Sequence, residues 1–184
     1  MPSNCKSAAK NVAVLLIDFL NPLDFTTDPA VIRRAISAAH ATRRYRHALE
    51  GTNTSFIYVN DHWGNWTESC TELVGRLKDS TLPGRQLVEL LAPRPRDYTL
   101  LKPRHSAFYG TPLEFLLQDL HVSRLVLTGL ATNNCVLFSA HDAYVHGYEL
   151  WVPSNCVAAE RIRDHRQALL HMRDVLKAKT LPTE

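Results

Sequence analysis

Cysteine is scarce in this sequence, and the residues present lie far apart. Cys5, Cys70, Cys135 and Cys156 are the four cysteines among 184 residues, and none forms a C-x-x-C pair. Such spacing gives no disulfide framework and is typical of a protein kept in a reducing compartment. We therefore predict a cytoplasmic protein.

Long apolar runs and dense charge clusters are also missing. No run of about 18 apolar residues exists to span a membrane, and residues 1–10 lack the apolar core of a signal peptide. The net charge is only +3, and Lys and Arg are scattered apart from small clusters at 43–46 and 161–166. A nucleic-acid-binding protein usually has a denser basic stripe with interleaved aromatic residues. We predict neither a membrane nor a nucleic-acid partner.

The composition is that of an ordinary globular protein. Hydrophobic residues make up 45% and charged residues 21%, and neither an internal repeat nor a low-complexity linker occurs. A chain of this length suffices for one sizeable core. We predict a single domain over residues 1–184.

Short apolar runs alternate with amphipathic stretches along the chain. The predicted strands are continuously apolar, as in a sheet covered on both faces, and span 12–17, 55–59, 98–102, 124–129 and 148–153. The predicted helices span 28–50, 111–120, 134–147 and 160–178. This alternation predicts an α/β fold: a three-layer αβα sandwich with a mainly parallel, Rossmann-like six-stranded sheet.

Capping signals mark two helix starts, and one segment shows no regular pattern. Asp28 followed by Pro29 predicts the start of the first helix, and Thr111 with Glu114 has capping-box spacing. Residues 61–97 include Pro83, Gly84, Pro93 and Pro95, and we predict a long, partly irregular crossover there.

Polar residues follow several predicted strands at their carboxyl ends, where ligands bind in open α/β sheets. Asp18 ends the first strand, Asn60-Asp61-His62 the second and Lys102 the next, while Cys135 follows the strand that ends at Gly129. Singly, Asp18 is explained as a cap, Lys102 as a surface charge and Cys135 as a small buried residue. Because all three are predicted at one edge of the sheet, they indicate a catalytic site there.

The three residue types suit acyl transfer. A helix N-terminus and a nearby ammonium lower the pKa of a thiol, which favours the nucleophilic thiolate. Asp18 can accept the thiol proton and pass it to a leaving amine, and Lys102 can stabilise the thiolate. The turn before Cys135 offers backbone N–H groups for an oxyanion.

Three segments resemble the signature blocks of the isochorismatase-like cysteine hydrolases, in the family's order and spacing over about residues 11–160. These segments are "LLIDFLNPL", "LLKPRHSAFYGTPLEFLL" and "LVLTGLATNNCVLFSAHDAYVHGYELWVPSNCVAA". The family includes nicotinamidases, N-carbamoylsarcosine amidases and ureidoacrylate hydrolases. The resemblance implies a hydrolase of small-molecule C–N bonds, without a cofactor, that assembles as a dimer or tetramer.

The resemblance also implies roles for individual residues. Asp18 would be the general acid/base, Lys102 its electrostatic partner and Cys135 the nucleophile. A non-proline cis peptide would join Leu130 to Ala131, and the N–H groups of Ala131 and Cys135 would form the oxyanion hole. The reaction would proceed through an acyl-thioenzyme.

The region of a nicotinamidase metal site departs from the family pattern. Nicotinamidases hold a metal through an Asp-x-His pair and a second His, but here Asn60 stands in place of the acid if His62 is aligned, and no second His follows where it is expected. We therefore predict no bound metal, which argues against a nicotinamidase. Asn60 is a candidate for hydrogen bonding to substrate, and Trp66 for an apolar pocket wall or for core packing.

Other pocket candidates have equally simple structural explanations. Phe19, Phe25 and Phe108 could shape a substrate pocket or pack in the core, and His105 could belong to the site or to a surface loop. Cys156 fits a core position. Because isochorismatases proper lack the cysteine and cleave a vinyl ether, Cys135 favours amide hydrolysis. Vinyl ether hydrolysis and a non-catalytic binding or assembly role stay as alternatives.

Overall fold

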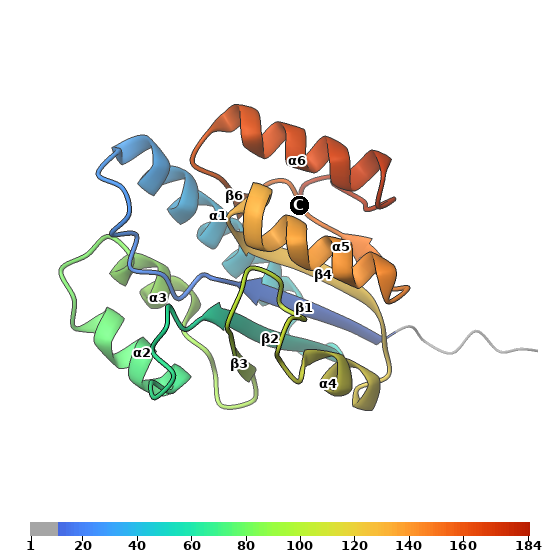
Figure 1. The fold of residues 1–184 in the computed structure, drawn as a ribbon, viewed down its shortest axis with the longest axis horizontal. Coiled ribbons are helices and arrows are strands. Elements are labelled where there is room, and N and C mark those ends of the chain that lie inside the picture. The colour runs from blue at the N-terminus through green and yellow to red at the C-terminus, as the bar shows by residue number, and fades with distance from the viewer. Residues whose placement is uncertain (1–10) are drawn as a thin grey trace, which may run out of the picture.

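The computed structural model describes residues 11–184, so the predictions on the first ten residues, including Cys5, lie outside the described residues. Strands and helices alternate along the described chain (Figure 1). The strands are β1 (Asn11–Ile17), β2 (Thr54–Asp61), β3 (Tyr98–Lys102), β4 (Val122–Leu130), β5 (Glu149–Trp151) and β6 (Val157–Ala158). The helices are α1 (Pro29–Ala48), α2 (Cys70–Lys78), α3 (Arg85–Leu91), α4 (Leu113–Asp119), the π-helical turn η1 (Thr132–Val136), α5 (Leu137–Val145) and α6 (Ile162–Asp174).

The strands form a six-stranded sheet in the order β3-β2-β1-β4-β5, with β6 paired to β4. Each of the strand pairs is parallel. Ile17 at the end of β1 lies opposite Val59 of β2 on one side and Gly129 of β4 on the other. The carboxyl ends of the central strands therefore meet at one edge, and the predicted fold class is confirmed.

Helices cover both faces of the sheet and make two hydrophobic layers (Figure 1). Alternate residues of β1 point to opposite faces, because side chains in a strand repeat every two residues. Ala13, Leu15 and Ile17 pack with residues of α4, α5 and α6. Val14 and Leu16 pack with residues of α1, α2 and α3. Each fully buried Leu or Ile contributes about 1.5–3 kcal/mol, and β1 supplies such residues to both layers.

The segment 61–97 is more regular than its sequence indicated, because it contains both α2 and α3. A capping box starts α2: the Ser69 hydroxyl accepts from the Glu72 N–H at 3.2 Å, and the Glu72 carboxylate accepts from the Ser69 N–H at 2.7 Å. The Ser-x-x-Glu spacing that signals such a box is present in the sequence. The prolines and glycines of this segment obscured it.

The two predicted helix starts have different outcomes. At α1, the Asp28 carboxylate accepts from the Ala30 N–H at 2.8 Å, as predicted. At α4, the predicted Thr111–Glu114 box is wrong. The Thr111 hydroxyl accepts from the Leu113 N–H at 3.2 Å, whereas the Glu114 carboxylate accepts a hydrogen bond from Gln118.

A buried arginine ties α1 to the sheet. The Arg46 guanidinium donates to the Tyr58 hydroxyl at 2.6 Å and to the Asp97 carboxylate at 2.6 Å, and Arg46 lies over the Phe56 ring. Arg46 and Asp97 are both almost fully buried. The pair thereby joins α1, β2 and the segment that leads into β3.

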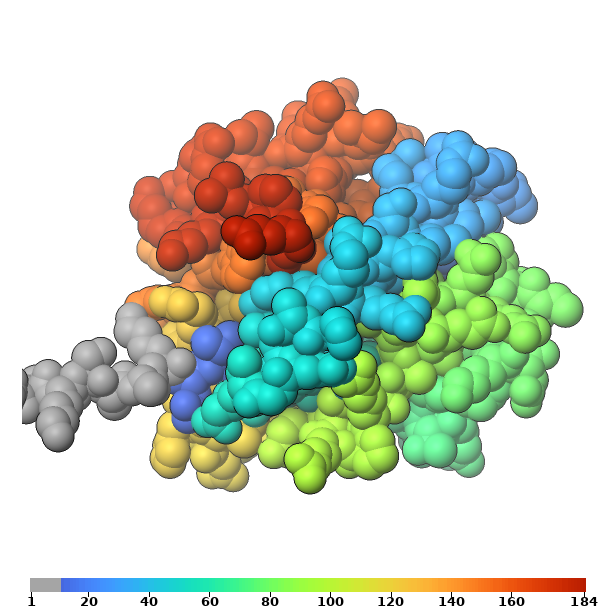
Figure 2. Space-filling model, turned by 180° about the vertical axis from the view of Figure 1, so that it is seen from behind, coloured from blue at the N-terminus to red at the C-terminus, as the bar shows by residue number. Residues whose placement is uncertain are grey.

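The C-terminal segment extends the sheet beyond β5. The Lys179 N–H donates to the Leu150 carbonyl at 2.9 Å, and the Val152 N–H donates to the Lys179 carbonyl at 2.8 Å. Seen from behind, this segment (red) lies next to the end of α1 (cyan), as Figure 2 shows. Within residues 11–184, no helix has both the length and the apolar character needed to cross a membrane.

Candidate active site

Three strands end in charged side chains that meet at the carboxyl edge of the sheet. The Lys102 ammonium lies 2.9 Å from the Asp18 carboxylate and 3.6 Å from the Asp61 carboxylate. Asp61 also donates its backbone N–H to Asp18 at 2.7 Å. Lys102 is fully buried and Asp18 almost so, which makes this a buried ion-pair cluster rather than a set of surface charges.

Cys135 completes this cluster. Its Sγ lies 3.5 Å from the Lys102 Nζ and also hydrogen-bonds the Asp18 side chain. The structure thus brings together all three residues singled out as catalytic candidates. Cys135 lies inside the π-helical turn η1, just before the regular helix α5 begins at Leu137. This turn places the thiol against the ends of β1 and β3.

Gly129 makes this close approach possible. It has a φ of +130°, and a Cβ at this position would lie 1.9 Å from the Ile17 carbonyl oxygen. No residue with a side chain fits there without displacing β1. The next peptide bond, Leu130–Ala131, is cis, at the position named from the sequence. The Ala131 carbonyl then accepts from the N–H groups of Asn134 at 2.9 Å and Val136 at 3.3 Å, which orders the turn.

The electrostatics of the thiol differ from the sequence-based expectation of a lowered pKa. Burial and the nearby Asp18 charge raise the pKa of Cys135 to about 12, although Lys102 opposes the shift. Burial also raises the pKa of Asp18, again against the effect of Lys102. For Lys102, burial alone lowers the pKa, but Asp18, Cys135 and Asp61 reverse this effect and raise it. The resting site therefore holds a protonated thiol beside an ion pair.

Two residues join the site without a clear role assigned from the sequence. The sequence placed Asp61 only among three polar residues that follow the predicted strand 55–59, yet Asp61 provides the second carboxylate next to Lys102. The sequence left His105 with two interpretations, a site residue or a surface-loop residue; it is exposed, and its Nδ1 lies 3.9 Å from the Cys135 Sγ. Its position three residues after Lys102 was the only available signal.

A third residue supports the turn from outside. The His165 Nδ1 of α6 lies 2.9 Å from the Thr132 hydroxyl, and Thr132 is fully buried at the start of η1. Nothing in the sequence pattern connects these two residues, because the contact joins elements far apart in the chain.

Two of the candidate substrate contacts lie inside the core instead. Phe19 is fully buried among the side chains that pack under α1, α2 and α3. Asn60 is fully buried too, and its side-chain amide is used by Leu20, accepting from its N–H at 3.0 Å and donating to its carbonyl at 2.8 Å. Asn60 thereby fixes the backbone that follows Asp18 rather than facing a pocket.

The remaining aromatic candidates are more exposed. Phe25 is 56% and Trp66 77% exposed, so Trp66 is not a core residue. The Trp66 ring lies 4.1 Å from the His62 ring, centroid to centroid. Phe108 is half-buried and stacks on His146 at 5.2 Å.

The residues that correspond to a nicotinamidase metal site do not fit a metal ion. The Asn60 side-chain amide is hydrogen-bonded to the Leu20 backbone, and the His62 Nδ1 accepts from the Gly64 N–H at 2.9 Å. Within the part of the chain that the structure describes, no three His, Cys, Asp or Glu side chains gather as a metal-binding group. No step of the chemistry below passes through a metal.

Cys156 is a core residue, but its backbone supports the site. Its side chain is fully buried, with the Thr183 hydroxyl 3.8 Å from the sulfur. Its carbonyl accepts from the Gly129 N–H at 3.0 Å. This bond holds the glycine at the end of β4.

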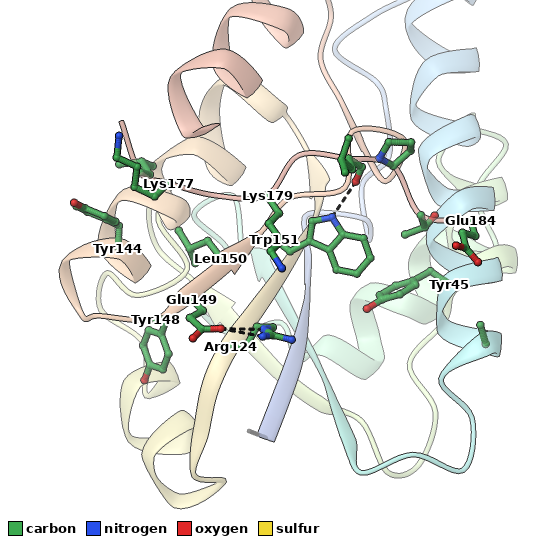
Figure 3. Close-up of a pocket in the computed structure, with 15 residues that line it drawn as sticks. Tyr45, Arg124, Tyr144, Tyr148, Glu149, Leu150, Trp151, Lys177, Lys179 and Glu184 are labelled. Atoms are coloured by element: carbon green, nitrogen blue, oxygen red, sulfur yellow. Dashed lines mark hydrogen bonds and ion pairs between the residues drawn. The ribbon is translucent and has the colours of Figure 1, made fainter. Parts of the chain in front are cut away.

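A separate hollow of about 800 Å³ lies between β5 and the C-terminal segment (Figure 3). Tyr45 and Trp151 form one aromatic wall, with ring centroids 5.3 Å apart, and the Trp151 indole donates to the Leu181 carbonyl at 2.9 Å. Arg124 and Glu149 form an ion pair on another side. None of Asp18, Lys102 and Cys135 lines this hollow.

Comparison with known proteins identifies relatives over nearly the whole chain. The family model described as the isochorismatase domain matches residues 12–181. The isochorismatase family protein YaaI of Bacillus subtilis is 33% identical over 173 residues, which cover 94% of each chain. The ureidoacrylate amidohydrolase RutB of Cronobacter sakazakii is 42% identical over 79 residues, or 43% of this chain and 34% of that protein.

Solved structures confirm the fold at lower identity. An isochorismatase family protein from Desulfovibrio vulgaris has a TM-score of 0.76 at 22% identity, with 95% of each chain covered. The nicotinamidase of Staphylococcus aureus has a TM-score of 0.72 at 22% identity, covering 94% of this chain and 99% of its own. Together with the match of the family model, these likenesses show that the chain belongs to the isochorismatase family of hydrolases, which has amidohydrolases among its members.

Proposed function

We propose that this protein is a metal-independent cysteine amidohydrolase, which cleaves a C–N bond of a small amide, ureide or carbamoyl compound. One observation carries the proposal: the Cys135 thiol contacts the buried Lys102 ammonium at 3.5 Å, and that ammonium is paired with Asp18 at 2.9 Å. A nucleophile within reach of an acid/base and a cation is the arrangement that acyl transfer requires.

Because the pKa of Cys135 is raised, the thiol needs a base, and Asp18 fits that role. Because the thiol is protonated at rest, its proton has to leave as the sulfur attacks, and the hydrogen-bonded Asp18 carboxylate is placed to take it. The S–C bond forms, and Asp18 returns the proton to the leaving nitrogen as the C–N bond breaks. Lys102 stabilises the negative charge that passes between sulfur and carboxylate.

Backbone N–H groups of the turn complete the proposed acylation step. We assign the oxyanion hole to the N–H groups of Ala131, just before the turn η1, and of Cys135, within it. Fixed donors of this kind are worth about 3–4 kcal/mol each in the transition state. The acyl-thioenzyme that results is then hydrolysed by water.

The names of the relatives agree with this chemistry. The protein RutB, which is 42% identical to this chain over 79 residues, is named as a ureidoacrylate amidohydrolase. An amidase of the same fold, the N-carbamoylsarcosine amidase of Thermoplasma acidophilum, has a TM-score of 0.70 at 22% identity. Small amides, ureides and carbamoyl compounds are therefore the first substrates to test.

A substrate panel tests the proposal. We expect ammonia or amine release from at least one small amide, ureide or carbamoyl compound, in the absence of added metal and after treatment with a chelator. If none of these compounds released ammonia or an amine but isochorismate was turned over, vinyl ether hydrolysis would replace the proposal. If neither isochorismate nor any of these compounds was turned over, a non-catalytic role would be favoured.

A further inference from the structure

His105 stands on the solvent side of the thiol. Its Nδ1 lies 3.9 Å from the Cys135 Sγ, while the ring as a whole is exposed. Among residues 11–184, the His105 ring nitrogens contact no polar group other than this sulfur. The same ring lies 5.5 Å from the Phe138 ring of α5, centroid to centroid.

The other two polar neighbours of the sulfur are sealed from solvent. Lys102 is fully buried, and the Asp18 side chain is 6% exposed. Cys135 itself is only 8% exposed. Water that approaches an acyl group on Cys135 therefore arrives from the side that His105 occupies, not from the side of Asp18.

We infer that His105 is the general base of deacylation, a division of labour in which Asp18 serves acylation and His105 activates the hydrolytic water. This inference rests on the proposed function, because it requires an acyl group on Cys135. A general base has to lie within hydrogen-bond reach of the proton that it removes, directly or through one water. The acyl carbon would be one bond from Sγ, which lies 3.9 Å from the His105 Nδ1, so this ring nitrogen is placed to accept a proton from a water that attacks that carbon.

The step balances without any further reactant. The His105 Nδ1 takes one proton from water as the water oxygen forms a bond to the acyl carbon. The C–S bond then breaks, the sulfur leaves with the bonding electron pair, and the proton on His105 returns to it. The products are a carboxylic acid and the Cys135 thiol, ready for another cycle.

A purely structural role for His105 makes a different prediction. If the ring only packs against Phe138, its removal would affect binding or stability, and added imidazole would not compensate. A base that has been removed can instead be replaced by a small base from solution. Chemical rescue therefore distinguishes the two roles.

p-Nitrophenyl acetate is a suitable probe, because its burst reports acylation and its steady state reports deacylation. We expect wild type to release about one p-nitrophenolate per chain in a burst that Cys135→Ala abolishes. In His105→Ala, the burst should persist while the steady state slows by about 100-fold, the usual contribution of a general base. Acetylated Cys135 should accumulate in intact-protein mass spectra, and added imidazole should restore turnover.

A matched control and the contrary outcomes make the test decisive. His40→Ala removes another exposed histidine, on α1, and should leave both phases unchanged. A normal burst with unchanged deacylation in His105→Ala overturns the inference and leaves the proposed function intact. So does slow deacylation that imidazole cannot restore. A wild type without any burst at Cys135 contradicts the proposed function itself.

Discussion

The Cys135 side chain is held as a thiol, not as a thiolate. Its pKa of about 12 follows from burial and from the Asp18 charge, which together outweigh the effect of Lys102. A site of this kind is unreactive until substrate arrives, because proton removal has to be coupled to attack. Reactivity toward alkylating agents and catalytic competence are therefore separate properties in this protein.

The Asp18→Asn variant separates these two properties. Because the Asp18 charge raises the pKa of Cys135, its removal should lower that pKa and speed alkylation of Cys135 near pH 9. Amide turnover should fall by about 100-fold or more, since the general base is lost. Iodoacetamide labelling, resolved by peptide mass spectrometry, measures the first effect. Slower labelling of Cys135 in this variant would show that Asp18 does not hold the thiol in its protonated form.

Replacing Lys102 by Met should make stability depend on pH. Burial already raises the pKa of Asp18 against the opposing effect of Lys102, so loss of the cation raises it further. The folded state then binds the Asp18 proton more tightly than the unfolded state, and stability is lost as pH rises through the folded pKa. We expect a loss of about 3 kcal/mol near pH 8, typical of breaking a buried ion pair, and a smaller loss near pH 5.

Urea unfolding at the two pH values measures this effect. Lys78→Met removes an exposed lysine of α2 and serves as the control, with little change expected at either pH. An equal loss of stability at both pH values in Lys102→Met would mean that Asp18 does not titrate as the geometry requires.

At the scale of elements, the sheet and most of the candidate active-site edge are predictable from the sequence. β1, β2 and β4 each contain a run of mostly apolar residues and end next to polar or small residues, so both the strands and the meeting of Asp18, Lys102 and Cys135 follow from known rules. Two features are not predictable in this way. The π-helical turn η1 has no sequence signature of its own, and the proline-rich segment 61–97 conceals α2 and α3.

Side-chain exposure is the other feature that local pattern does not determine. Phe19 and Phe25 look alike in the sequence, yet one is fully buried and the other 56% exposed, because only Phe19 lies beneath α1, α2 and α3. Asn60 likewise appeared as a pocket residue, but its partner Leu20 lies on another strand end. Contacts between distant elements decide such cases.

The contact between α6 and η1 carries a prediction of its own. The His165 ring holds the Thr132 hydroxyl at the start of the turn that presents Cys135. Its loss should cost about 1 kcal/mol, the net value of one hydrogen bond, and lower kcat by up to about tenfold while KM changes little. The control is His171→Ala, which removes another histidine of α6, one whose Nε2 lies 3.1 Å from the His141 Nε2 of α5.

Equal kinetics for the two variants would show that α6 does not position the turn. Partial recovery in His165→Asn, which can still bond Thr132, would support the positioning role.

At the scale of the whole molecule, large apolar side chains are exposed on segments that follow β1, β2 and β3, the strands that end at the candidate site. Phe25 follows β1, Trp66 follows β2 and Tyr109 follows β3, and they are 56%, 77% and 62% exposed. Residues of this type are enriched at the cores of protein interfaces. We propose that a second copy of the chain covers this edge in a dimer or tetramer and helps to enclose the small-molecule substrate.

Analytical ultracentrifugation tests this assembly. We expect a dimer or tetramer for wild type and a shift toward monomer in Trp66→Ser. Val145→Ser, which changes an exposed residue at the far end of α5, should leave the assembly unchanged. A monomer at all accessible concentrations would contradict the proposed enclosure of the site.

The central claim is that Cys135 is the nucleophile of an amide hydrolysis. The most direct test measures ammonia release from the best small amide of the panel by Cys135→Ala and by Cys156→Ala, which removes the other buried cysteine of the described chain. We expect turnover to fall by at least about 1,000-fold in Cys135→Ala, as for loss of a nucleophile, and to stay near the wild-type value in Cys156→Ala. Turnover by Cys135→Ala within tenfold of wild type would contradict it.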